Sequence, residues 1–298
     1  MRPAESGTLP IGGGSVSADP PLRDGDTVRP TTVVADGTRR WKPAPGAALG
    51  IAGVLTFILL WELVVRLGLV SSAYLPAFTQ TLSSLTDLLT TASFWSQIGA
   101  TARGWALGLG IASALGIALG ILIGSVPALT ALTKTTIEFL RPVPSVALVP
   151  LVVIMFGTGP ESTLVLVVYA AFWQMLVQVI YGVHDVDPVA KETAQSFRLG
   201  TWRTVRNVVW PTALPYAMTG FRLAAAVALI LEITGELIIG SPGIGKAISL
   251  AQTAGDAQRM YALVIVAGLA GVAVNVGVRL LEKRVLRWHP SVRKGTEA

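Results

Sequence analysis

The sequence predicts an all-α polytopic membrane protein with about six transmembrane helices. Of its 298 residues, 52% are hydrophobic and 13% are charged, and the mean hydropathy is +0.63. Charged residues make up about a quarter of a typical soluble domain, so this charged share is low. The apolar residues gather in runs of about 20, the length that an α-helix needs to cross the hydrocarbon core of a bilayer.

Six segments are expected to span the membrane, at residues 47–67, 98–124, 126–156, 161–183, 212–239 and 260–281. Residues 77–92 mix polar and apolar side chains, which predicts an amphipathic helix on the membrane surface. Residues 1–46 are rich in Gly, Pro, Asp, Ser and Thr and are expected to form a disordered cytoplasmic tail, without the apolar stretch of a signal peptide. A transmembrane domain is therefore expected at 47–288 and a second cytoplasmic tail at 289–298.

The basic residues predict the orientation of the chain in a cell membrane. Segments 1–46, 184–211 and 282–298 hold 15 lysines and arginines, whereas segments 68–97, 157–160 and 240–259 hold 2. Cytoplasmic loops carry the excess of Lys and Arg. Both termini and the loop 184–211 are therefore expected in the cytoplasm.

Small residues and prolines mark two of the spans. Glycines at spacings of four recur in the second span, where small residues let helices approach closely in lipid: Gly104, Gly108, Gly116, Gly120 and Gly124. They serve helix packing within the protomer or a seam between two copies, and the sequence leaves both open. The third span is broken by Pro142, Pro144 and Pro150 and followed by Gly157, which predicts either a plain kink or a hairpin that lines the transport path.

Charged side chains inside apolar runs are costly unless they are paired or reach water. Glu62 and Arg66 stand one turn apart in the first span, and we expect them to pair with each other. Glu232 and Glu236 share one face of the fifth span and face a polar vestibule or lie near the outer interface. Arg222 either snorkels to the cytoplasmic interface or offers positive charge to an anion in the path.

The residue inventory excludes several kinds of chemistry. The chain has no cysteine, and its two histidines, His184 and His289, are expected in loops rather than as metal ligands. No catalytic constellation and no metal site are predicted. Residues 240–247 approach a phosphate-binding loop, but Ala247 stands where the magnesium-binding hydroxyl would be, and the loop is expected outside. The basic and aromatic residues of 198–210 fit a cytoplasmic membrane loop better than a nucleic-acid site.

Residues 191–215 form a polar island between two spans and read as helix, turn, helix. The island resembles the signature of ABC-importer permeases: Glu-Ala-Ala, three residues, Gly, nine residues, then Ile-x-Leu-Pro. Residues 192–194 (Glu192, Thr193, Ala194) match its start and Pro211 matches its end. Arg198 stands at the glycine position, and the sequence leaves open whether Arg198 makes the turn or the turn shifts to Gly200.

Further segments between about 50 and 288 resemble the same family, in its branch for nitrate, aliphatic sulfonates and taurine. They are Trp61-Glu62, residues 141–151, Phe156 to Gly159, Gly220-Phe221-Arg222, and Glu236-Leu237-Ile238 followed by Gly243-Ile244-Gly245. The resemblance implies a type I ABC importer permease fold in which residues 187–209 couple the permease to a cytoplasmic ATPase subunit. It also implies a path or gate near Arg222, Glu232, Glu236, Gly243 and Gly245.

The same resemblance implies the partners and the division of labour. A permease homodimer within membrane lipid would bind two cytoplasmic ABC ATPase subunits and an extracytoplasmic substrate-binding protein, with no nucleic acid. ATP and Mg would be bound by the ATPase, so this chain would be non-catalytic and without cofactor. Two other functions remain open from the residues: a proton-coupled secondary transporter that uses Glu232 and Glu236, and a membrane scaffold that docks a cytoplasmic partner.

Overall fold

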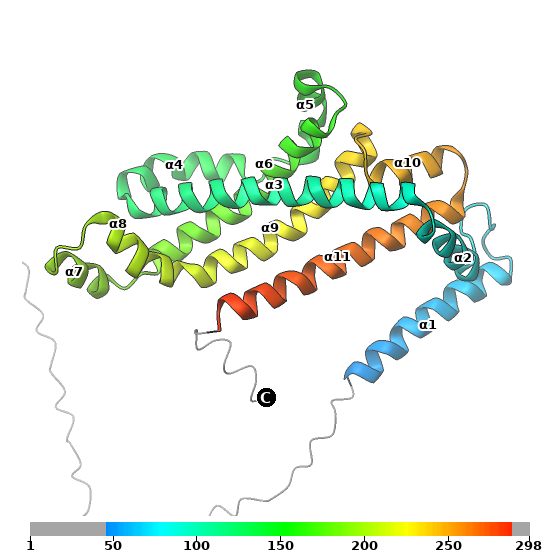
Figure 1. Cartoon of the computed structure of the whole chain (residues 1–298), viewed down its shortest axis with the longest axis horizontal. Helices are drawn as coiled ribbons and strands as arrows, with labels where there is room; N and C mark the ends of the chain where they lie inside the picture. Colours follow the sequence, from blue (N-terminus) through cyan, green and yellow to red (C-terminus); the bar gives the residue numbers. More distant parts are fainter. Residues whose placement is uncertain (1–45, 288–298) are drawn as a thin grey trace, which may run out of the picture. The chain divides into compact units, whose positions relative to one another are not determined.

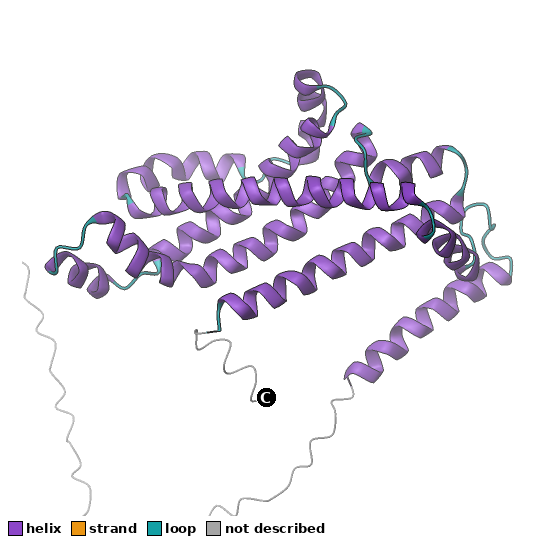
Figure 2. Cartoon of the chain, viewed as in Figure 1, coloured by secondary structure: helices purple, strands orange, loops and turns teal. Residues whose placement is uncertain are grey.

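The computed structural model describes residues 46–287, and every regular element in that range is a helix (Figure 2). Within this range, residues 50–287 belong to one compact unit. Apart from Gly46, the predicted cytoplasmic tails at 1–46 and 289–298 lie outside the described residues, as does His289.

The helices follow one another in chain order (Figure 1). They are α1 (Gly46–Arg66), α2 (Phe78–Leu89), α3 (Ala92–Ser125), α4 (Pro127–Leu140), the 3-10 helix η1 (Ser145–Leu148), α5 (Val149–Phe156), α6 (Pro160–His184), α7 (Pro188–Ser196), α8 (Thr201–Thr204), the π-helix η2 (Val205–Val209), α9 (Trp210–Ile239), α10 (Ile244–Thr253) and α11 (Ala257–Val285). The surface helix expected at 77–92 corresponds to α2.

Four of these helices, α1, α3, α6 and α11, are each long and apolar enough to cross a bilayer. Two further pairs qualify when each is taken as one bent span: α4 with Ser145–Phe156, bent by 83°, and Thr201–Ile239 with α10, bent by 41°. Counted in this way, the described residues hold up to six spans, in agreement with the predicted all-α fold of about six transmembrane helices.

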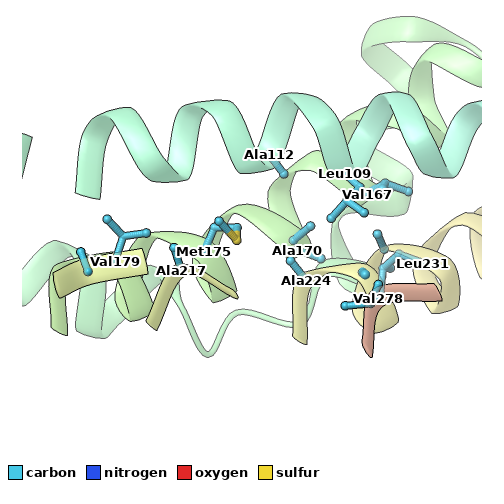
Figure 3. Close-up of a cluster of buried hydrophobic side chains, with 14 of the residues drawn as sticks. Leu109, Ala112, Val167, Ala170, Met175, Val179, Ala217, Ala224, Leu231 and Val278 are labelled. Atoms are coloured by element: carbon cyan, nitrogen blue, oxygen red, sulfur yellow. The ribbon is translucent and has the colours of Figure 1, made fainter. Parts of the chain in front are cut away.

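The core of the described bundle is built by α3, α6 and α9, because α6 packs along both of the others (Figure 1). The cluster of buried side chains where they meet is drawn in Figure 3. It contains Leu109 and Ala112 of α3, Val167, Ala170, Met175 and Val179 of α6, Ala217, Ala224 and Leu231 of α9, and Val278 of α11. The many alanines allow close contact between helices in a setting where lipid offers no hydrophobic drive for association.

The glycines of α3 face α6 within the same chain. A Cβ on Gly116 would lie 2.5 Å from the Met175 Cβ, and a Cβ on Gly120 would lie 2.7 Å from the Val179 Cγ1. Gly108 and Gly124 stand in the same way against valines of α6. These four glycines therefore serve packing within the protomer, and of the two interpretations left open the seam between two copies is wrong for them.

The proline-rich break lies between α4 and α6. Pro144 precedes η1, Pro150 lies in the first turn of α5, and Gly157 ends α5 with a φ of 80°. Proline fits the first turn of a helix because that turn's N–H has no partner within the helix. The 83° bend between α4 and residues 145–156 shows a true break of direction rather than a mild kink.

The predicted pair in α1 is confirmed. The Arg66 Nε donates to the Glu62 Oε1 at 2.7 Å. Glu62 also accepts hydrogen bonds from the backbone N–H (3.2 Å) and the hydroxyl (3.0 Å) of Thr79. One carboxylate thus joins α1 to the start of α2.

Candidate functional site

A largely exposed helical segment between two spans is formed by residues 187–209, which we call the coupling segment. Its first helix, α7, begins at Pro188 after the N-cap Asp187, whose carboxylate accepts the Val189 N–H at 2.8 Å. Ala194 is the one buried residue of α7, at 2% exposure. Glu192 and Thr193 are exposed, and the described residues offer Glu192 no ion-pair partner.

The turn after α7 is made by Arg198, which is the one described non-glycine residue with a positive φ, at 50°. The Leu199 N–H donates to the Ala194 carbonyl at 2.9 Å and the Arg198 N–H to the Gln195 carbonyl at 2.8 Å. This pair of bonds is a Schellman motif with Arg198 at the left-handed position, which is usually glycine.

Gly200, in contrast, has φ −62° and ψ 158°, an extended backbone open to any residue. The structure therefore places the turn where the family signature has its glycine, and a shift to Gly200 is wrong.

The second half of the coupling segment runs directly into a span. Helices α8, η2 and α9 form one stretch from Thr201 to Ile239, with Pro211 in the first turn of α9. Single π-helical turns are rare and occur often at functional sites. The second half of the coupling segment and α9 are therefore one continuous helical stretch.

Large apolar side chains of the coupling segment face outward. Phe197 is 76% exposed and Trp202 is 74% exposed, and Val189 is exposed as well. Exposed apolar side chains of this size are suited to contact with lipid headgroups or with a protein partner.

At its other end, α9 carries Glu236, which is fully buried and satisfied. The Thr101 Oγ1 donates to the Glu236 Oε1 at 2.7 Å, and the Gly245 N–H donates to the Glu236 Oε2 at 2.8 Å. The Thr101 Oγ1 in turn accepts the Ile244 N–H at 2.9 Å. We call these contacts the Glu236 latch, because they fix the start of α10 to α3 and α9.

The latch explains two glycines of the predicted gate. A Cβ on Gly243 would overlap the Glu236 carboxylate, and a Cβ on Gly245 would lie 2.7 Å from the Glu236 Cβ. Only glycine lets the backbone come this close to the carboxylate. Sequence analysis named Glu236, Gly243 and Gly245 but missed Thr101, since a lone threonine in an apolar helix gives no signal of a partner 135 positions away.

Glu232 lies one turn before Glu236 on α9 and is in a different state. It is 5% exposed, and its Oε2 is buried without a hydrogen-bond partner among the described residues. Its carboxylate stands against the backbone of Gly104, where a Cβ would overlap it. It lines a cavity of about 350 Å³, the Glu232 cavity, whose other walls include Arg103, Leu107, Pro160 and Ser241.

Two further cavities continue along α6. The leucine cavity, of about 460 Å³, is walled by Ile111, Leu115, Leu119, Leu164, Val165, Val168, Tyr169 and Phe172 and shares Leu164 with the Glu232 cavity. The basic cavity, of about 710 Å³, lies between α4 and α6, and its walls include Lys134, Arg141, Pro142, Gln174, Tyr181 and His184. The three cavities thus follow α6 from its first turn to its last, polar at both ends and apolar in the middle.

The remaining candidate residues are placed elsewhere. The Arg222 Nη1 lies 3.4 Å from the Glu282 Oε2, so this arginine joins α9 to α11. Pro144, Pro150 and Gly157 shape the break between α4 and α6, and neither these three residues nor Arg222 line the three cavities. Within the described range no group of three or more His, Cys, Asp or Glu side chains is placed to hold a metal ion.

The described residues thus form a bundle of helices long and apolar enough to span a membrane, with cavities along α6 and an exposed helical segment at one end. The chain belongs to the family of binding-protein-dependent transport system inner membrane components, whose profile matches residues 116–287, more than half of the chain. It is therefore a non-catalytic, multi-pass inner-membrane permease of an ABC importer, in which ATP hydrolysis resides on a separate subunit. The secondary-transporter and scaffold interpretations are set aside on this ground.

Named relatives agree with this assignment. The chain is 30% identical over 264 residues to the taurine transport system permease protein TauC of Escherichia coli, which covers 85% of this chain and 94% of the relative. It is 27% identical to the putative aliphatic sulfonates transport permease protein SsuC of Bacillus subtilis, over 78% of this chain and 85% of the relative. It is 28% identical to the bicarbonate transport system permease protein CmpB of Synechococcus elongatus, over 84% and 94%.

A solved structure supports the fold alone. A chain in the crystal structure of a bacterial alginate ABC transporter, in complex with its alginate pentasaccharide-bound periplasmic protein, superposes with a TM-score of 0.56. The match covers 84% of this chain and 98% of that chain at 17% identity. The type I importer permease fold implied by the sequence is thereby confirmed.

Proposed function

We propose that two copies of this chain form the path by which an ABC importer moves a small anion of the taurine, aliphatic sulfonate, bicarbonate and nitrate group. The relatives named above carry these substrates in their names, and a further relative is the nitrate import permease protein NrtB of Leptolyngbya laminosa. The observation that carries the proposal is the coupling segment, exposed at one end and continuous with α9, which bears the Glu232 cavity at the other end.

In this proposal the coupling segment lies in the cytoplasm and docks an ABC ATPase subunit. Glu192 offers one carboxylate to a basic residue of the ATPase, while Phe197 and Trp202 supply apolar contact. Closure of the ATPases on ATP displaces the segment, and the continuous helix from Thr201 to Ile239 carries the movement to the other side of the membrane. Both chain termini lie in the cytoplasm, as the Lys and Arg distribution favours.

The path runs along the α3–α6 face and is closed by the same face of the second copy. Its outer end is the Glu232 cavity and its inner end is the basic cavity, where Lys134 and Arg141 attract an anion. The leucine cavity between them is an apolar barrier to a hydrated ion until the helices move apart. The extracytoplasmic binding protein delivers the substrate next to the Glu236 latch, which orders the loop of residues 240–245.

The function is tested by reconstituting the permease with its ATPase and binding protein in proteoliposomes. We expect uptake of at least one of taurine, ethanesulfonate, bicarbonate and nitrate that requires ATP and survives a protonophore. Uptake that needs a proton gradient and no ATP would contradict the proposal.

The orientation is tested separately in this naturally cysteine-free chain. A cysteine at residue 200 should react with an impermeant thiol reagent only from the cytoplasmic side, and a cysteine at the exposed residue 246 only from the outside. Labelling from the opposite sides would show that the chain has the reverse orientation in the membrane.

A further inference from the structure

The Glu232 cavity holds a buried acceptor that nothing in the fold uses. Glu232 and Glu236 are neighbours on the same helix, yet Glu236 receives two hydrogen bonds and Glu232 Oε2 receives none from the described residues. A buried polar group without a partner is destabilising by about 1–3 kcal/mol, and more when it is charged. The chain thus bears the free-energy cost of an unpartnered buried oxygen at Glu232, whereas both carboxylate oxygens of Glu236, one turn away, accept hydrogen bonds.

This acceptor has the setting of a ligand contact. The cavity of about 350 Å³ lies within the size range of small-molecule sites. Its neighbour Ser241 is already engaged, since the Ser241 and Thr163 hydroxyls share a hydrogen bond of 2.7 Å. The Glu232 carboxylate lies against Gly104 of α3, which has no side chain that could donate a hydrogen bond to it. The unpartnered Glu232 Oε2 is therefore able to accept a hydrogen bond from a ligand.

A cationic group stands on the same cavity. Arg103 lines it, and among the described residues its guanidinium makes no ion pair and only one hydrogen bond, from Nε to the Gly99 carbonyl at 3.3 Å. Pro160 and Glu161 in the first turn of α6 also line the cavity, so the helix N-terminus adds partial positive charge and Glu161 adds a second carboxylate. The cavity therefore offers the buried Glu232 carboxylate and the Arg103 guanidinium, with a second carboxylate at Glu161.

Charge decides which small anion fits. A simple anion such as nitrate or bicarbonate has no ammonium group that could donate to the unpartnered Glu232 oxygen. A molecule with an ammonium group at one end and an anionic group at the other satisfies the carboxylate and Arg103 together. Charge-assisted hydrogen bonds of this kind are about twice as strong as neutral ones.

We propose that the Glu232 cavity is a substrate site for a small zwitterion, an amino-sulfonate or a close analogue, in which Glu232 binds the ammonium and Arg103 binds the anionic end. The inference rests on the proposed import function and narrows its substrate class. It selects, from the anions in that group, the one kind that carries a primary ammonium.

The first test needs no binding protein and reads the charge of the cavity directly. Leu107 is exposed on the cavity wall, so Leu107→Cys presents a single thiol there. The permease–ATPase complex is treated with two methanethiosulfonates of matched length, one ending in ammonium and one in sulfonate. The control is Leu115→Cys in the leucine cavity, where no charged side chain is part of the wall.

We expect the ammonium reagent to be favoured at position 107 by about tenfold or more relative to position 115, which corresponds to about 1.4 kcal/mol. Glu232→Gln should abolish this preference and Glu232→Asp should keep part of it. Equal ratios at the two positions, or a preference that survives Glu232→Gln, would overturn the proposal. If Glu232→Gln fails to fold, Glu161→Gln is measured instead, and a preference at position 107 that Glu161→Gln abolishes would assign the charge to Glu161 and overturn the proposal.

The second test separates this inference from the import function. In the reconstituted importer, taurine uptake is compared with propanesulfonate, which replaces the ammonium by a methyl group, and with nitrate. We expect the unaltered importer to prefer taurine, and Glu232→Gln to lower taurine uptake by about tenfold or more. ATP-driven uptake of nitrate or propanesulfonate that Glu232→Gln leaves unchanged would sink the zwitterion site while import stands. No ATP-driven uptake of any substrate would sink the import function itself.

Discussion

Arg198→Gly tests the structure of the coupling segment most sharply, because it replaces a strained residue by the one that the turn favours. A left-handed backbone costs an ordinary L-residue about 1–2 kcal/mol, whereas glycine adopts it freely. Arg198 holds a φ of 50° at the end of α7. After allowing for the greater freedom of glycine in the unfolded segment, we expect Arg198→Gly to stabilise the end of α7 by about 1 kcal/mol.

Hydrogen exchange measures this gain at the amides that the turn protects. The N–H groups of Phe197, Arg198 and Leu199 donate back into α7 at 2.8–3.0 Å. In the permease alone, in lipid nanodiscs, a gain of about 1 kcal/mol should slow their exchange about fivefold. The absence of the ATPase keeps any contact that Arg198 makes with it out of the measurement.

Gly200→Ser is the matched control. Gly200 has an extended backbone, a Cβ there would meet no atom within 4 Å, and serine suits its position as the N-cap of α8. The exchange of the α7 amides should therefore stay as in the unaltered chain. Unchanged or faster exchange in Arg198→Gly, or an equal effect of Gly200→Ser, would refute the placement of the turn at Arg198.

Three further substitutions test the packing and the polar contacts. Gly116→Val forces a side chain against α6 and should destabilise the detergent-solubilised permease by about 1–3 kcal/mol in thermal unfolding. The control is Gly110→Val, where a Cβ meets no atom within 4 Å and no such loss is expected. Equal stabilities of the two variants would show that α3 and α6 do not pack as described. Thr101→Val removes the hydroxyl that hydrogen-bonds both Glu236 and the Ile244 N–H at the start of α10. It should lower the free energy of unfolding by about 1–3 kcal/mol and speed hydrogen exchange of the α10 amides. Unchanged exchange in α10 would contradict the Glu236 latch. Arg222→Gln breaks a partly exposed ion pair and should cost at most about 1 kcal/mol with uptake retained; loss of uptake at normal membrane levels would return Arg222 to the path.

The sequence predicted those features of the fold that depend on local pattern. Apolar runs of the length of a membrane span located the helices, and the i,i+4 spacing of Glu62 and Arg66 predicted their ion pair, because both signals lie within one helix. The glycines of α3 announced close packing but not the partner, since the choice between α6 and a second copy depends on tertiary contact. Only the structure shows Met175 and Val179 facing them.

The arrangement of the candidate site was harder to predict from the sequence. Glu232 and Glu236 share a spacing and a helix face, yet one is bound in a latch and the other is left unpartnered in a cavity. That difference depends on Thr101 and Gly104, which are far away in the chain. The left-handed turn at Arg198 was equally hidden, because side-chain type favoured Gly200 while the helix register placed the turn two residues earlier.

The central claim is that the coupling segment transmits ATP hydrolysis to the path, and Glu192→Ala in the reconstituted importer tests it most directly. In the proposed contact, burial of the Glu192 carboxylate against a basic residue of the ATPase makes its removal costly, by about 3–5 kcal/mol if the pair is fully desolvated and less at a wet rim. Gln195→Ala, on the same exposed helix and without a charge, is the control. We expect Glu192→Ala to lower uptake per ATP hydrolysed, or the amount of bound ATPase, by about tenfold or more at normal membrane levels, with Gln195→Ala near the unaltered protein. Full uptake and full ATPase binding in Glu192→Ala would contradict the claim.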